Sequence, residues 1–251
     1  MKDQNALAYI NMFAVLKDLE KLCELDDRAK QLASPAKPIS ISFNVGNGPK
    51  ATLAFENGKC TMTEGLGGQI KLKLSSPEAF NQMVDGTKNP LPYGGLTKLK
   101  FLMNDFKELT DIMNKYLRAD EASLKDRKFY EKSTTLMFYL IANALSALGN
   151  NDELGKLSAS KIPDGSIAME IVGGPCAEVV VKGGHMTTYN RKAANPRAYM
   201  IFADFDTARG LFDGSTEAMS ALAAGKIVMK GYIPMIDNLN RVLGRVGVYL
   251  A

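Results

Sequence analysis

The residues that could carry out catalysis are few and widely spaced in this 251-residue chain. His185 is its single histidine, and it directly follows the pair Gly183-Gly184. General acid–base catalysis at neutral pH most often uses histidine, and it needs a partner that orients the ring. A lone histidine beside a glycine turn therefore indicates an exposed surface residue. We expect no catalytic residue, no histidine-based metal site and no cofactor.

The cysteines are equally unpromising as nucleophiles. Cys23, Cys60 and Cys176 lie far apart, form no paired-cysteine motif, and have no obvious base nearby in the sequence. An odd and sparse count favours a reducing compartment over a disulfide scaffold. The first residues, MKDQNALAYINMF, lack the apolar centre of an export signal. We expect a cytoplasmic protein.

Two glycine-rich stretches faintly resemble phosphate-binding loops. They are GNGPK at residues 46–50 and GLGG at residues 65–68. Both lie between expected strands and not before a helix, and neither has Walker spacing, so hairpin turns are favoured. No serine-elbow or zinc-protease motif occurs in the sequence.

Charge and hydropathy narrow the class of partner. The net charge of +4 is mild and shows no basic stripe interleaved with aromatics, so we expect no nucleic acid, while transient contact with a membrane surface is permitted. The most apolar run, residues 134–148, is short for a membrane span and contains Asn143 and Ser146. It predicts a buried helix.

The chain repeats itself over most of its length. ATLAFENGKCTMT from Ala51 aligns with AEVVVKGGHMTTY from Ala177, and SISFNV from Ser40 aligns with SIAMEI from Ser166. Two residues enter the second copy near Asn195-Pro196, a turn-forming pair where an insertion is tolerated. Repeats of this length indicate duplicated domains. We place the boundary in the polar stretch RADEASLKDR, which predicts domains at residues 1–121 and 122–251.

The elements of one copy follow from periodicity and turn residues. A helical segment ends at Pro35 and Pro38 and is followed by short strands at 39–45, 52–55, 60–63 and 70–74. A helix begins after Ser76 and stops at Gly86; in the second copy Asp204 and Gly214 take those places. A late strand, 99–102 or 227–230, then leads to a closing helix. This order predicts an α+β fold: two tandem domains, each a mostly antiparallel sheet of about five strands covered by helices.

Two stretches carry a resemblance to a known family. DGTKNPLPYGGLTKLKFL, residues 85–102, resembles the sterol carrier protein 2 family, whose pattern here is Gly-Lys-x-Asn-Pro followed by Gly-Lys-Leu-Lys-Ile-x-Gly. The first copy keeps Lys88-Asn89-Pro90 but has Thr97 where the strand's glycine is expected. The second has lost the Asn-Pro, with Glu217-Ala218 instead, yet keeps GKIVMKG at residues 225–231. Each copy preserves what the other has lost.

The resemblance implies a protein that binds or carries a lipid or similar apolar small molecule in a hydrophobic tunnel, with no catalysis of its own. Sterols, fatty acids, acyl chains and phospholipids are the ligands of that family, and an apolar tunnel cannot name one of them. Two alternatives stay open: an interaction or structural module whose tunnels are filled with side chains, and a non-catalytic subunit of an enzyme whose catalytic chain is separate.

The ligand-binding residues are expected on the second helix, the late strand and the last helix of each copy. Methionine, which occurs 13 times, adapts to irregular apolar partners and is frequent in these elements, although ordinary core packing predicts nearly the same residues. The candidates are Phe80, Met83, Leu91, Tyr93, Phe101, Phe106, Leu109 and Met113, with Phe212, Met219, Met229, Met235 and Leu239 in the other copy.

Overall fold

The computed structural model describes residues 2–250, apart from the side chain of Leu91. The chain forms two compact units, Asp3–Lys125 and Asp126–Ala251. The division falls inside the polar stretch where a boundary was expected, four residues beyond the predicted cut between 121 and 122. A short 3₁₀ turn, Ser123–Lys125, ends the first unit.

The first unit contains a five-stranded sheet in the order β3-β2-β1-β4-β5. The pairs β1–β2, β2–β3 and β4–β5 are antiparallel, and β1 runs parallel to β4. The strands are β1 (Ile39–Val45), β2 (Lys50–Glu56), β3 (Lys59–Glu64), β4 (Ile70–Leu74) and β5 (Leu91–Gly94).

The second unit contains a sheet whose order, read from its other edge, is β8-β7-β6-β9-β10, with β6 parallel to β9. Its strands are β6 (Gly165–Ile171), β7 (Cys176–Lys182), β8 (His185–Tyr189), β9 (Ala198–Phe202) and β10 (Ile227–Gly231). The α+β class with five strands in each sheet is confirmed. That both units are copies of one sterol carrier protein 2-like domain stays a prediction.

Two-residue turns join the central hairpins, as the sequence predicts. Asn57 and Gly58, between β2 and β3, have φ values of 52° and 76°. Gly183 and Gly184, between β7 and β8, have φ values of 56° and 77°. Left-handed φ at both turn residues is the type I′ geometry, which matches the twist of antiparallel strands and favours Asn-Gly or Gly-Gly.

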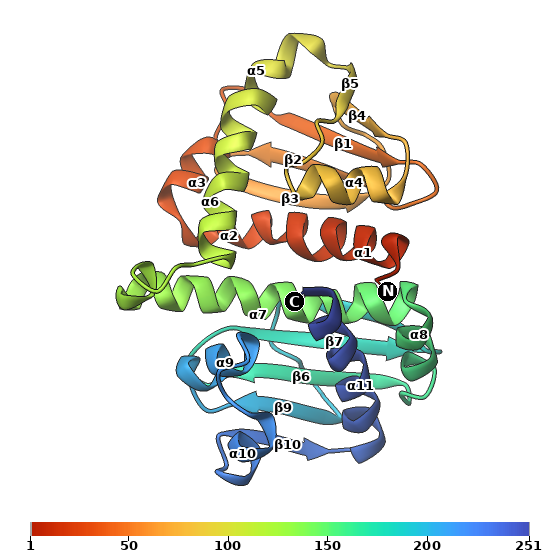
Figure 1. Cartoon of the computed structure of the whole chain (residues 1–251), viewed down its shortest axis with the longest axis vertical. Coiled ribbons are helices and arrows are strands. Elements are labelled where there is room, and N and C mark those ends of the chain that lie inside the picture. Colours follow the sequence, from red (N-terminus) through yellow and green to blue (C-terminus); the bar gives the residue numbers. More distant parts are fainter. Residues whose placement is uncertain (1, 251) are drawn as a thin grey trace. The chain divides into compact units, whose positions relative to one another are not determined.

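Helices cover one face of the first sheet, where Figure 1 shows α4 and α6 crossing in front of the strands. The N-terminal helical segment is not one regular helix: a π turn (Asn11–Val15) and a 3₁₀ turn (Leu16–Asp18) interrupt it. The α-helices are α1 (Gln4–Ile10), α2 (Leu19–Leu25), α3 (Asp27–Leu32), α4 (Pro77–Val84), α5 (Leu99–Phe101) and α6 (Lys107–Leu117).

In the second unit α9 and α11 likewise lie on one face of the sheet (Figure 1). The amide of Asn240 on α11 lies 3.6 Å from the sulfur of Met229, so Met229 of β10 faces α11. The helices are α7 (Arg127–Asn151), α8 (Glu153–Ala159), α9 (Phe205–Phe212), α10 (Ala218–Ala223) and α11 (Ile233–Leu250). Among residues 2–250, no helix has the length and apolar character needed to span a membrane.

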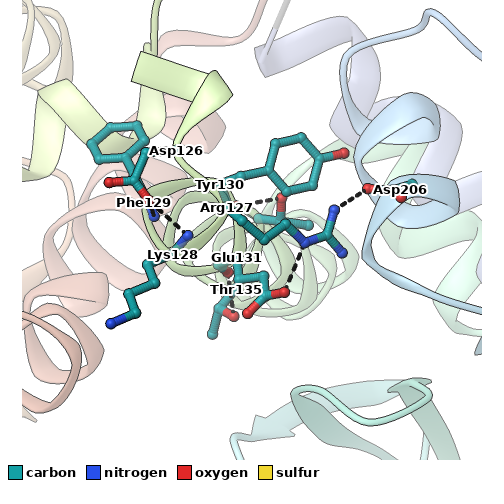
Figure 2. A network of polar contacts seen from close by, with 9 residues as sticks. Asp126, Arg127, Lys128, Phe129, Tyr130, Glu131, Thr135 and Asp206 are labelled. Atoms are coloured by element: carbon teal, nitrogen blue, oxygen red, sulfur yellow. Dashed lines mark hydrogen bonds and ion pairs between the residues drawn. The ribbon is translucent and has the colours of Figure 1, made fainter.

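A polar network fixes the start of α7 (Figure 2). The carboxylate of Asp126 accepts hydrogen bonds from two main-chain N–H groups of the first turn and so caps the helix. The Arg127 guanidinium donates to Glu131 on the same helix at 2.8 Å and to Asp206 of α9 at 2.7 Å. Burial, together with the neighbouring Asp206 carboxylate, raises the pKa of Tyr130 to about 12. The network joins α7 to α9.

The late strand of the first unit is not where the sequence predicted it. Residues 99–102 were expected to be a strand, but Leu99–Phe101 is helical and continues through a π turn, Leu102–Phe106, into α6. The fifth strand is instead β5, which pairs with β4 in the register Lys73↔Leu91 and Leu72↔Pro92. A proline is tolerated there because β5 is an edge strand. The left-handed Gly95, φ 74°, then ends the strand.

The late strand of the second unit does follow the prediction. The last five residues of GKIVMKG form the edge strand β10, in which Ile227 is buried and Val228, on the opposite face, is 42% exposed. Gly231 has φ 102°, and a Cβ there would approach the carbonyl oxygen of Arg197 to 2.3 Å. The glycine therefore permits a close approach to the chain entering β9. The short helix α10, which precedes the strand, was not predicted.

Candidate functional site

A pocket of ≈ 460 Å³ opens in the first unit where β4, α4 and the segment leading into β5 meet. Its volume lies within the range of small-molecule sites. Four apolar or aromatic residues and four polar ones line it: Leu74, Ala79, Pro90 and Tyr93, with Lys73, Ser75, Lys88 and Asn89.

Local sequence signals position the walls of this pocket. Ser76 caps α4 by accepting a hydrogen bond from the Ala79 amide at 3.2 Å, and Pro77 occupies the first helical turn. After the helix, Gly86 takes a left-handed φ of 74°, and the amide of Thr87 donates to the Gln82 carbonyl at 2.8 Å. The chain is thereby turned back toward β4.

The Lys-Asn-Pro motif closes the pocket on its other side. Lys88, Asn89 and Pro90 immediately precede β5, whose first residue pairs with Lys73 of β4. The strand pairing therefore holds the motif beside the end of β4. Part of the stretch that suggested the family resemblance, Lys88-Asn89-Pro90 with Tyr93, therefore lines this pocket.

The wall of the pocket is mostly apolar and includes two basic residues. Lys73 and Lys88 both line it, and none of its lining residues is an acid. Ala79 lies in the first turn of α4, where the helix dipole also favours negative charge. The arrangement suits an apolar molecule that carries an anionic group.

Three of the predicted residues meet in an aromatic cluster between sheet and helices of the first unit. Phe80 from α4 lies 6.3 Å from Phe43 of β1, measured between ring centroids, and Phe106 lies 6.2 Å from Phe43. Phe101 lies 5.2 Å from Phe55 of β2. These rings pack against one another, so aromatic side chains fill this part of the interior between the sheet and the helices.

The other predicted residues divide by exposure. Leu109, Met113, Met235 and Leu239 are buried, whereas Met83, Phe212 and Met229 are half-buried. Tyr93 and Met219 are 52% and 68% exposed, and of these two Tyr93 lines the pocket. The side chain of Leu91 lies outside the described residues. Whether the buried set lines a ligand cavity stays a prediction.

Sequence reasoning missed several residues of the site. Phe43 and Phe55 were assigned to strands but not to the cluster, although alternation along β1 and β2 places both on the buried face. Lys73 and Lys88 were not selected because only apolar positions were sought. The motif Lys88-Asn89-Pro90 was the signal that could have found the pocket.

The structure places the residues that were considered for catalysis in different elements. His185 is exposed at the first position of β8. Cys23 of α2 and Cys60 of β3 are buried; burial raises the pKa of Cys23 to about 12 and raises that of Cys60 well above its ordinary value. Such thiols are poor nucleophiles at neutral pH. Among residues 2–250, no group of three or more His, Cys, Asp or Glu side chains could hold a metal ion.

Comparison with solved structures gives likenesses at low sequence identity. No family model and no curated protein matches the chain. A solved structure described as "UbiJ-SCP2 Ubiquinone synthesis protein" is similar over 43% of this chain and 88% of that one, at 14% identity and a TM-score of 0.34. The inverting sec-alkylsulfatase Pisa1 from Pseudomonas sp. is similar at 11% identity and a TM-score of 0.26; the match covers 67% of this chain but 35% of the sulfatase.

Proposed function

We propose that the protein binds and carries an apolar small molecule with an anionic head group, and that the pocket of the first unit is a binding site. The observation that carries the proposal is the pocket of ≈ 460 Å³ whose wall includes Lys88-Asn89-Pro90. Leu74, Ala79 and Pro90 supply the apolar contact that an acyl chain or ring system requires.

The two lysines give the pocket its preference for charge. Lys73 and Lys88 approach it from β4 and from the segment before β5. Because no carboxylate lines the pocket to neutralise them, a carboxylate or phosphate on the ligand would complete the charge pairing. Long-chain fatty acids and phospholipids have this combination of groups.

The same site argues for carriage without catalysis. Its lining contains no histidine, cysteine or acid that could act as nucleophile or general base. The polar side chains of the lining are Ser75, Asn89 and the two lysines, together with the hydroxyl group of Tyr93. None of the lining residues is a carboxylate or an imidazole that could serve them as a base. We expect the bound molecule to leave unchanged.

Binding of oleate and of oleyl alcohol, measured by calorimetry, tests the proposal. Removing both lysines, Lys73→Ala with Lys88→Ala, should weaken oleate binding by up to about thirtyfold, because each of the two exposed ion pairs contributes up to about 1 kcal/mol. Binding of the uncharged alcohol should not change. Lys71→Ala is the matched control, since Lys71 is an exposed lysine of the same strand that does not line the pocket.

Two results would contradict the proposal. The parent protein failing to bind either molecule would remove the binding function. A loss of oleate affinity in Lys71→Ala equal to that in the double variant would show that overall charge, and not the pocket, attracts the ligand.

A second candidate function is an interaction module with a filled interior. The packed rings of Phe43, Phe80 and Phe106 favour it, because aromatic side chains occupy space that a tunnel would need. Native mass spectrometry of protein purified from cells separates the two: a co-purifying lipid supports the carrier, and bare protein that retains a second chain supports the module.

A further inference from the structure

Both units expose large apolar side chains in the segments around the edge strands β5 and β10. In the first unit these are Tyr93, Leu96 and Met103, which are 52%, 63% and 67% exposed. In the second unit Met219 and Ile233 are 68% and 58% exposed, and Leu222, Val228 and Tyr232 range from 38% to 42%. They belong to short successive elements around β5 and around β10.

The charges along these edges are of one sign. Residues 86–104 contain Lys88, Lys98 and Lys100 and no acid, although Asp85 and Asp105 flank them. Residues 218–236 contain Lys226 and Lys230 and no acid, and again acids flank the segment. We call residues 86–104 and 218–236 the late-edge segments. Each combines exposed apolar groups with an excess of positive charge within the segment, although Lys226 also interacts with Asp204 and lowers the pKa of that carboxyl group.

We propose that the late-edge segments dock the protein on the surface of an anionic lipid bilayer. Such a surface offers negative head groups for the lysines and an apolar layer directly beneath for Leu96, Met103, Met219 and Ile233. Tyrosine is well suited to the boundary between the two, because its ring is apolar and its hydroxyl polar. Nucleic acid would match the lysines but not the exposed aliphatic side chains.

The arrangement around Tyr232 and Tyr199 supports an interfacial role. The Arg197 guanidinium lies 4.7 Å from the centroid of the Tyr232 ring, and the Lys230 ammonium lies 5.0 Å from that of Tyr199. In both pairs a cation is held against an aromatic ring beside the edge strand β10. A cation beside a ring can contact a phosphate while the ring remains in the interfacial layer.

In the first unit the docking surface overlaps one part of the pocket. Lys88 and Tyr93 belong to both the pocket and the late-edge segment. Docking would therefore bring the pocket close to the lipids, an expectation that rests on the proposed function. The docking test uses neither residue, so the two proposals can fail separately.

Sedimentation of the full chain with vesicles tests the proposal. The parent should bind vesicles of phosphatidylcholine with phosphatidylserine more tightly than vesicles of phosphatidylcholine alone, and salt should weaken this binding. Replacing Lys98, Lys100, Lys226 and Lys230 by glutamine should reduce affinity by about fivefold per lysine that contacts the surface. The variant Leu96→Ser, Met103→Ser, Met219→Ser, Ile233→Ser should bind more weakly at high salt as well.

Helix α8 provides the matched control. Leu154→Ser, Lys156→Gln and Leu157→Ser remove a lysine and two leucines that are 54% and 55% exposed but lie outside the late-edge segments. Vesicle binding should be unchanged in this variant. The proposal is overturned if the parent does not sediment with phosphatidylserine vesicles, or if the α8 variant loses as much binding as the late-edge variants. It is also overturned if the serine variant alters self-association on gel filtration and leaves vesicle binding intact, because a second copy would then be the occupant.

Discussion

Asp152, between α7 and α8, connects three helices of the second unit and is the most informative position for a stability test. The residue is 3% exposed. Its carboxylate accepts hydrogen bonds from the Gly155 amide at 2.9 Å, from Nε and Nη2 of Arg245 at 3.0 and 2.9 Å, and from the Tyr249 hydroxyl at 2.7 Å. One side chain thus caps α8 and holds α11. We consider the change Asp152→Ala.

The magnitude follows from the three interactions that the change removes. Loss of the helix cap costs about 1 kcal/mol. Loss of the two-pronged pairing with Arg245, whose side chain is 24% exposed, costs about 1.5 kcal/mol after allowance for solvent. The buried Tyr249 hydroxyl is left without this acceptor, at about 1.5 kcal/mol. We expect a total of about 4 kcal/mol, and about half of that for Asp152→Asn, which keeps an acceptor for the cap.

The effect of pH provides a second measure of the same network. Burial alone would raise the pKa of Asp152, but the hydrogen bonds from Arg245, Tyr249 and the Gly155 amide outweigh it and lower the pKa below its ordinary value of 3.8. The stabilisation is therefore present above the unfolded-state pKa and is lost as pH falls through the lower, folded-state pKa. Asp152→Asn should lose less stability than the parent on acidification.

Urea unfolding followed by circular dichroism measures the change, and hydrogen exchange with mass spectrometry assigns it to the second unit. Asp206→Asn is the control, because Asp206 pairs with Arg127 in an exposed salt bridge (Figure 2) and should cost about 1 kcal/mol or less. A cost for Asp152→Ala no greater than that of the control would refute the reasoning.

Three further predictions concern the core and the absence of catalysis. Asp18 is buried, and neither of its carboxylate oxygens has a hydrogen-bond partner among the described residues. Burial raises the pKa of Asp18 well above its ordinary value despite Lys21, so the parent should lose stability as pH rises through this pKa. Urea titrations of Asp18→Asn should show a smaller decline in stability with pH, and an unchanged slope would count against this prediction. Met113→Trp or Met235→Trp should reduce lipid binding with unchanged circular dichroism if either methionine lines a cavity, and binding equal to the parent's in both variants would contradict that assignment. The protein should turn over neither acyl-CoA nor esters, and turnover that His185→Ala or a Cys→Ala variant abolishes without unfolding would reinstate an enzyme.

The α+β class and most of the elements were predictable because their signals are local. Asn57-Gly58 and Gly183-Gly184 encode their hairpin turns through φ values that other residues adopt at a cost. Ser76 and Asp204 cap α4 and α9 because their side chains reach amides only three residues away. Such interactions are specified within a few residues, so they are readable in one sequence.

The late strand shows what local patterns could not decide. Residues 98–101 align with the start of β10 and were expected to form a strand, yet Leu99–Phe101 is helical. β5 occupies the edge beside β4, and Phe101 packs on Phe55 of the sheet. Strand pairing and core packing are long-range choices, and they override the preference of a short segment.

The sequence by itself therefore determined the turns, the helix caps, the buried faces of the strands and the small number of candidate catalytic groups, since each depends on residue type and near neighbours. The tertiary structure alone decided which strand completes the first sheet, that Phe43 and Phe55 meet Phe80 and Phe106, and that Lys73 and Lys88 line one pocket. Those groups are distant in sequence, and only the pairing of β4 with β5 brings the two lysines to the same place.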